Sequence, residues 1–152
     1  MPRCNSMIAL AIVVALTAFM PLLASADTNP YARTPQKGDS VRFSGAVGDE
    51  QFGWGFYNEY WLQTYMRFTI EAARNPSVYS KSQAALAAIG EHTLVLPNGT
   101  PGVVEEVKQY EYGGREDVQV RVMVQQGQLR GNEVWTTAGE LVDSTGKTYL
   151  KS

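Results

Sequence analysis

The pattern of hydrophobic and polar positions changes three times along the chain. Residues 7–23 form an almost purely apolar run, residues 38–47 alternate, residues 54–74 carry apolar side chains at helical spacing, and alternation returns from residue 93 onward. Alternation is typical of half-buried strands, and a period of about 3.6 residues is typical of a helix with one buried face. The sequence therefore predicts an α+β fold with a helical middle and a β-rich C-terminal half.

The middle segment, residues 54–74, carries an aromatic stripe. At about 100° per residue, six apolar side chains fall on one narrow helical face: Trp54, Tyr57, Trp61, Tyr65, Phe68 and Ala72. Asn75-Pro76 then provides a stop signal. A second helix is expected to begin at Ser80, which forms a capping box with Gln83, and to end at Gly90. We expect the two helices to form a hairpin that packs on the β half.

The β half is expected to contain five short strands. Alternation and turn residues place them at 93–96, 103–111, 118–126, 134–137 and 148–151. Asn98-Gly99 marks a tight turn after the first of these strands, and Gly113-Gly114 joins the second to the third. In the third strand, alternate valines from residue 118 to residue 124 share one face, which should be core. Five short strands in about sixty residues predict a small barrel or a curled antiparallel sheet.

Three features of this half, in order, resemble the bacterial SH3-like family of exported proteins. They are an apolar strand with a Gly-Thr turn and a valine strand (Leu94 to Val104), a long two-strand hairpin, and a glycine ahead of a strand tryptophan (Gly131 to Trp135). Ala138 to Val142 looks like the short turn and last strand of such barrels. The glycine stands four positions before Trp135, farther than in the family pattern. The resemblance implies a non-catalytic module that binds cell-wall glycan, peptide or a protein partner.

The N-terminal region has the features of a secretory signal. Arg3 is followed by the apolar run, and Ala24-Ser25-Ala26 offers small residues for cleavage. We therefore expect residues 1–26 to be a signal peptide, residues 27–37 an extended arm, residues 38–92 a strand plus the helical hairpin, and residues 93–152 the SH3-like half, which packs with 38–92 as one unit. The expected location is periplasmic or secreted, with no stable membrane span after cleavage.

Composition narrows the function classes. Of the 152 residues, 126 follow the expected signal, with no cysteine, 12 basic and 15 acidic side chains, and a net charge of −3. This weak acidic balance without a basic run argues against nucleic-acid binding. A single histidine, His92, at the expected helix–strand junction provides neither a metal set nor a cofactor site. The expected partner is a cell-wall component or an envelope protein.

The inventory of catalytic residues favours a protein that is not an enzyme. Gly38-Asp39-Ser40-Val41 resembles the nucleophile block of GDSL-type hydrolases, but Ile89 stands where their aspartate would precede the histidine. A turn that opens a strand over residues 41–47, with Val41 and Phe43 on its buried face, explains the motif better. Glu105 and Glu106 are adjacent in an expected strand, which should point them to opposite faces. The sequence predicts no catalytic residue.

Three aromatic residues are the candidate contacts for a ligand or partner: Phe56, Tyr60 and Trp135. Phe56 and Tyr60 are expected on the polar side of the first helix, where packing on the sheet does not explain them. Trp135 either lines a groove or belongs to the core. Two alternatives to a binding module stay open. One is a secreted inhibitor or immunity-type protein that uses the loops 97–102 or 127–131, and the other is a small envelope hydrolase with a carboxylate pair.

Overall fold

The structure is a computed structural model that describes residues 31–45 and 52–149. In this part of the chain, helices α1 (Glu59–Arg74), α2 (Ser77–Lys81) and α3 (Gln83–Glu91) accompany an essentially antiparallel sheet, which confirms the α+β class. The expected signal peptide lies outside the described residues, as does Val47.

Nine strands of the described chain form one sheet, in the order β1-β9-β8-β2-β5-β6-β7-β3-β4. Neighbouring strands are antiparallel except β1 and β9, which are parallel. The strands are β1 (Tyr31–Ala32), β2 (Ser40–Phe43), β3 (Phe52–Phe56), β4 (Thr93–Pro97), β5 (Pro101–Tyr112), β6 (Arg115–Val124), β7 (Glu133–Thr137), β8 (Leu141–Val142) and β9 (Thr148–Tyr149), with a 3-10 turn at Ala138–Glu140.

The sheet curls on itself around an inner core. Strands β2 and β3 are separated by three strands in the sheet order, yet a Cβ on Gly53 would lie 3.0 Å from the Cβ of Phe43. Gly102 approaches Val122 as closely across β5 and β6, where a Cβ would be 2.3 Å from Cγ1. A glycine at each position allows the backbone to approach these side chains so closely. The concave side is filled by buried residues that include Phe43, Leu96 and the valines of β6.

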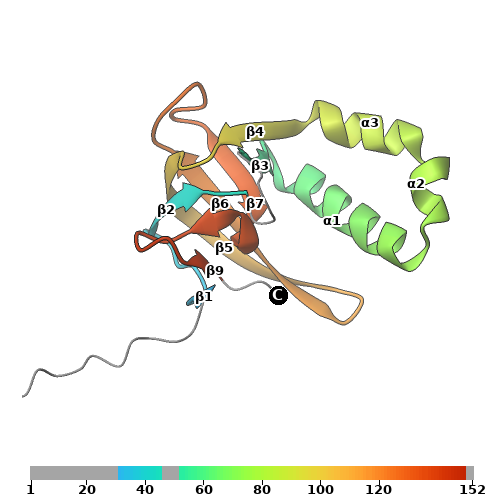
Figure 1. Ribbon diagram of the computed structural model, residues 1–152, viewed down its shortest axis with the longest axis horizontal. Coiled ribbons are helices and arrows are strands. Elements are labelled where there is room, and N and C mark those ends of the chain that lie inside the picture. The colour runs from blue at the N-terminus through green and yellow to red at the C-terminus, as the bar shows by residue number, and fades with distance from the viewer. Residues whose placement is uncertain (1–30, 46–51, 150–152) are drawn as a thin grey trace, which may run out of the picture.

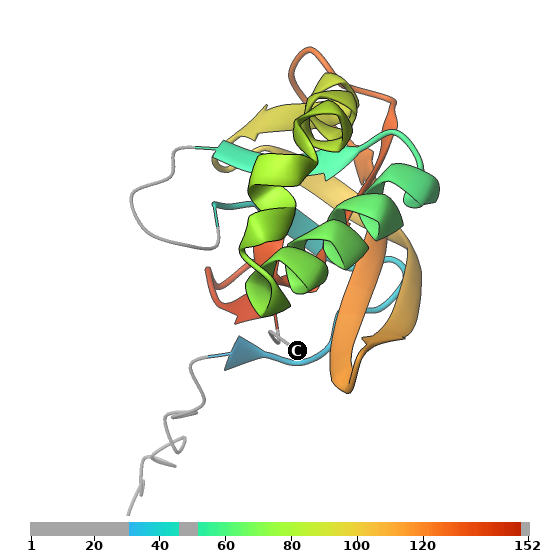
Figure 2. The ribbon, with the colours of Figure 1, turned by 90° about the vertical axis from the view of Figure 1, so that its right-hand side faces the viewer.

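The helices form a hairpin inserted between two paired strands. β3 leads into α1, α3 leads into β4, and β3 and β4 are neighbours with Phe56 opposite Thr93. In Figure 1 the helical hairpin extends to one side of the sheet, and Figure 2 shows it from that side, in front of the strands. A second core, built around Phe56, Leu62 and Trp135, joins the helices to the convex side of the sheet. The insertion is therefore anchored at its base.

The helix expected over residues 54–74 begins five residues later than predicted. Residues 52–56 form β3 instead, in which Phe52, Trp54 and Phe56 share one face with glycines between them. The two glycines disfavour a helix and fit the tight approach to neighbouring strands. Asn58 is the N-cap of α1, and its side-chain oxygen accepts a hydrogen bond of 3.1 Å from the Trp61 N–H. The expected stop at Asn75 is confirmed.

The second predicted helix is two helices, α2 and α3, and the expected capping box is absent. The Gln83 side chain donates to the Tyr79 carbonyl, and the Ser80 hydroxyl donates to the carbonyl of Ser77. Gly90 lies inside α3, and His92 is its C-cap residue. These side chains bond to the preceding turn, so neither is free to cap the helix that follows.

The arm expected at residues 27–37 is tied to the sheet where it is described. β1 pairs with β9, and Arg33 forms an ion pair of 2.6 Å with Asp39. That contact lowers the pKa of Asp39, and the Gln36 N–H donates to the same carboxylate. The Gly38-Asp39 turn is confirmed, with a positive φ of 91° at Gly38.

The five strands predicted from residue 93 onward correspond to β4, β5, β6, β7 and β9, with ends that differ by up to three residues, and residues 150–151 of the last prediction lie outside the described residues. β5 and β6 form a long hairpin with Tyr112 opposite Arg115, and both turn glycines between them have positive φ. Val120, Val122 and Val124 are buried as expected. Gln119, on the opposite face of β6, is also fully buried, and its amide donates to the Tyr112 hydroxyl. The sequence pattern did not indicate this buried polar contact.

Candidate functional site

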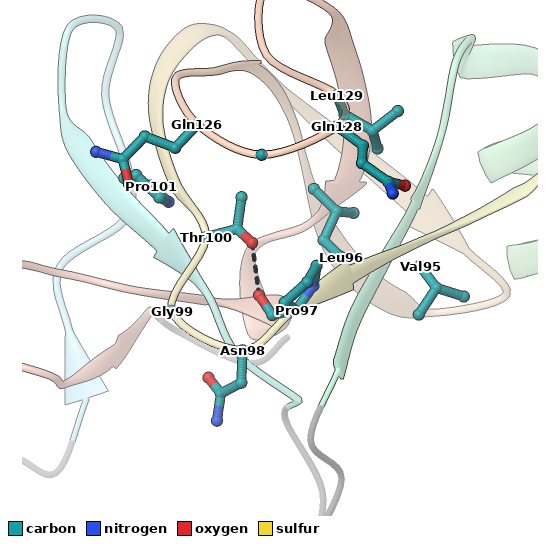
Figure 3. Close-up of a pocket in the computed structure, with 11 residues that line it drawn as sticks. Val95, Leu96, Pro97, Asn98, Gly99, Thr100, Pro101, Gln126, Gln128 and Leu129 are labelled. Atoms are coloured by element: carbon teal, nitrogen blue, oxygen red, sulfur yellow. Dashed lines mark hydrogen bonds between the residues drawn. The ribbon is translucent and has the colours of Figure 1, made fainter.

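Two loops meet around a groove at one end of the curled sheet. Residues 95–101, from β4 and its turn into β5, form one wall, and residues 126–129, from the connection of β6 to β7, form the other. The space between them measures about 330 Å³, which suits a small ligand or a few side chains. We call this space the loop groove. In Figure 3, Leu96 and Thr100 point toward the loop that carries Gln126 to Leu129.

Local hydrogen bonds hold both walls of the loop groove. The Thr100 hydroxyl donates to the Pro97 carbonyl at 2.6 Å, and the Thr100 N–H donates to the same oxygen at 3.0 Å. Across the groove, the Asn132 N–H donates to the Leu129 carbonyl at 2.9 Å, and Gly127 has a positive φ of 82°. Both walls are therefore ordered turns rather than loose connections.

Among the residues that the structure describes, those lining the loop groove carry no charged side chain. Its apolar part includes Leu96, Pro97 and Leu129, and its polar part consists of a hydroxyl and the neutral amides of Asn98, Gln126 and Gln128. Leu129 also packs against the inner core, so the groove opens directly beside it. Such a surface complements an uncharged ligand with both apolar and hydrogen-bonding groups.

An exposed apolar strip borders the loop groove. Val95 is 61 % exposed on β4 and Phe52 is 51 % exposed on β3. The pairs Phe52–Pro97 and Trp54–Val95 put these four residues on one face of the β3–β4 ribbon, beyond the pair Phe56–Thr93 at the base of the helices. Exposed apolar side chains gathered beside a groove are typical of interaction surfaces.

The structure separates the three aromatic residues predicted from the sequence. Phe56 is only 1 % exposed, so the expectation that it lies on the surface is wrong; it is part of β3, and its ring packs beside those of Trp54 and Tyr65. Tyr60 is 68 % exposed, and Trp135 is 6 % exposed within the core that joins helices and sheet. None of the three lines the loop groove.

A charged cluster fastens the start of α1 to β5. The Glu59 carboxylate accepts hydrogen bonds from Lys108 at 2.7 Å, from Gln63 at 2.9 Å and from the Tyr110 hydroxyl. Burial disfavours the charged form of Glu59 and would raise its pKa. The hydrogen bonds, of which that from Lys108 has the largest effect, outweigh burial and lower the pKa of Glu59 below its ordinary value. Burial and the contact with Glu59 raise the pKa of Tyr110. The cluster is a structural clasp between helix and sheet.

Two cations cover the ring of Trp135. Lys108 Nζ lies 5.0 Å from the ring centroid and Arg121 Cζ lies 5.9 Å from it. Arg121 also pairs with Glu133 at 2.8 Å and with Glu106 at 3.2 Å. The ring is thus closed off from the surface, which assigns Trp135 to the core rather than to a groove.

The expectation that Glu105 and Glu106 point to opposite faces is wrong. A bulge between Val104 and Glu106 breaks the register of β5 with β6, so simple alternation does not hold there, and both glutamates are among the residues that line one shallow, open hollow. Glu106 is paired there with Lys108 at 3.5 Å as well as with Arg121. The hollow therefore holds a balanced group of charges.

His92 stacks on Trp61 with ring centroids 4.0 Å apart, and Tyr60 meets the same tryptophan edge-on.

No three His, Cys, Asp or Glu side chains within residues 31–45 and 52–149 gather in a way that could hold a metal ion. In that same part of the chain, no helix is long and apolar enough to cross a membrane. Comparison of the chain with protein-family models, with curated proteins and with solved structures found no match.

Proposed function

We propose that the protein is an exported, non-catalytic binding module of the bacterial periplasm or cell envelope, with an SH3-like curled sheet, and that it holds a peptide or protein partner in the loop groove. The observation that carries this proposal is the meeting of two ordered turns around an uncharged space of about 330 Å³ beside exposed Val95. The signal features of residues 1–26 support export.

The chemistry of the groove favours a polypeptide over a glycan. Sugar rings are usually held against the faces of aromatic side chains, and the residues that line the loop groove include none. Amide and hydroxyl groups next to leucine side chains instead match the mixture of peptide groups and side chains that a polypeptide presents. The most exposed aromatic residue of the helices, Tyr60, does not line the groove.

The inhibitor alternative uses the same two loops, residues 97–102 and 127–131. Inhibitors of enzymes commonly insert a protruding loop into the partner's cleft. Here the two loops frame a hollow, so this protein is better suited to receive a partner's segment than to insert one of its own.

Site-specific photocrosslinking tests the proposed function. A photoreactive amino acid replaces Gln128, which lines the loop groove, or Gln109, which is also exposed but lies on β5 outside the groove. We expect one discrete protein adduct in envelope extract from position 128 and none from position 109. Retention on purified peptidoglycan without any protein adduct would assign a wall ligand instead. Equal adducts from both positions, or neither adduct nor retention, would overturn the proposal.

A further inference from the structure

We propose that the loop groove receives an extended, uncharged polypeptide segment that adds to the sheet as a further strand along the outer edge of β4. This inference rests on the proposed function and names the class of ligand. In the order of the sheet, β4 is the last strand of the described chain and has β3 as its one neighbour. An edge strand offers backbone groups to which another chain can pair.

The hydrogen bonds of β3 show which groups of β4 face outward. The Trp54 carbonyl accepts a hydrogen bond of 2.7 Å from the Thr136 hydroxyl, so Trp54 directs its backbone groups toward β7. In an antiparallel pair, residues alternate between facing the partner and facing away, and opposite residues do the same. Val95 is opposite Trp54 and therefore directs its N–H and C=O to the open edge.

The neighbours of Val95 limit the open edge to a short stretch. Leu94 and Leu96 alternate with Val95, so they direct their backbone N–H and C=O groups toward β3. Pro97 has no N–H, and its carbonyl already accepts two hydrogen bonds from Thr100. Thr93, two residues before Val95, also directs its backbone groups away from β3, and it lies close to the end of α3. The edge thus accepts a strand of a few residues centred on Val95, with Pro97 as its limit.

The lining of the groove selects the chemistry of the added strand. Side chains alternate across a strand, so successive residues of the segment would fall on the side of Leu96 and on the side of Val95. Both sides are apolar or neutral, and the residues lining the groove include no Asp, Glu, Lys or Arg. A charged side chain placed there would lose hydration and gain no counterion. The complementary segment is therefore uncharged and extended.

Val95→Pro tests the strand addition directly, because it removes the outward N–H while keeping every hydrogen bond between β3 and β4. Val95→Ala is the matched control, since it shortens the valine side chain to Cβ and keeps the N–H. The probe is a phage-displayed library of random heptapeptides, selected on the full-length protein. We expect enriched peptides poor in charged residues, and we expect Val95→Pro to bind them at least tenfold more weakly than Val95→Ala, which measures the loss of the side-chain contact alone.

Hydrogen exchange of the wild-type protein adds a measurement that needs no variant. An enriched heptapeptide, made synthetically, should slow exchange of the Val95 N–H at least tenfold and leave the Gln109 N–H unchanged. Unslowed exchange at Val95, or equal binding by Val95→Pro, would overturn strand addition; crosslinking from position 128 would then still support groove binding. Failure to enrich any peptide, with a glycan retained in the groove, would overturn only the ligand class assigned here.

Discussion

Replacing Gly55 by alanine should change the stability of the protein in opposite directions for the observed strand and for the helix expected from the sequence. A Cβ at this position would lie 2.4 Å from Val134 Cγ1 and 2.8 Å from the Trp135 carbonyl oxygen. Real Cβ contacts are never this short, and one of the obstacles is backbone, which cannot rotate away. Gly55→Ala should therefore force β3 away from β7, at the point where Phe56 pairs with Trp135.

The magnitude follows from the cost of overpacking, which is typically about 1–3 kcal/mol. Because one contact is with backbone, we expect the upper part of that range, about 2–3 kcal/mol. For a chain of this size, each kcal/mol lowers the thermal midpoint by about 4 °C, so the midpoint of Gly55→Ala should fall by about 10 °C. Circular dichroism of the purified variant, scanned with temperature, measures this shift.

The control is Gly90→Ala in α3. A Cβ there has no neighbour within 4 Å, and alanine is favoured over glycine in a helix by about 1 kcal/mol. Its midpoint should rise by a few degrees. If Gly55→Ala also raised the midpoint, residue 55 would be helical, as the aromatic stripe predicts, and the assignment of β3 would be refuted.

Three further predictions concern the clasp and the aromatic residues. The folded state lowers the pKa of Glu59, so the wild-type protein should lose stability as pH falls from about 5 through that lowered value. Glu59→Gln should remove much of this loss. Urea midpoints between pH 3 and pH 7 measure the effect, and identical pH profiles for the wild type and the variant would contradict the clasp. Phe56→Ala should cost about 3–5 kcal/mol in urea unfolding, because the ring is buried in the core that joins helices and sheet. Tyr60→Ala should change stability by about 0.5 kcal/mol or less in the same assay, and a larger loss would mean that the ring is not exposed as described.

Local patterns predicted most of the β half because its strands lie next to one another in the chain. The alternation of valines in β6 and the Gly113-Gly114 turn are properties of a few consecutive residues, and both were confirmed. The stop of α1 at Asn75 is similarly local. Where a hydrogen bond or a backbone angle is satisfied within a few residues, the sequence carries the information itself.

The assignment of residues 54–57 failed because two patterns compete there. Trp54 and Tyr57 continue the helical spacing of α1 by coincidence, whereas Phe52-Gly53-Trp54-Gly55-Phe56 alternates large and absent side chains as a strand does. Asn58 was the local signal for the true helix start. Choosing Asn58 over Trp54 as the start of the helix requires knowing that the two glycines lie against neighbouring strands, which is a property of the assembled sheet.

The sequence by itself determined the α+β class, the strands of the β half and the turns that link them, because periodicity and turn chemistry act over short stretches. Tertiary structure alone decided what those elements enclose. It buried Phe56 and Trp135 between helices and sheet, put Glu105 and Glu106 at one hollow through a bulge, and joined two loops about thirty residues apart into the loop groove. These outcomes depend on which strands become neighbours and how strongly the sheet curls, and both arise from packing between residues distant in the chain.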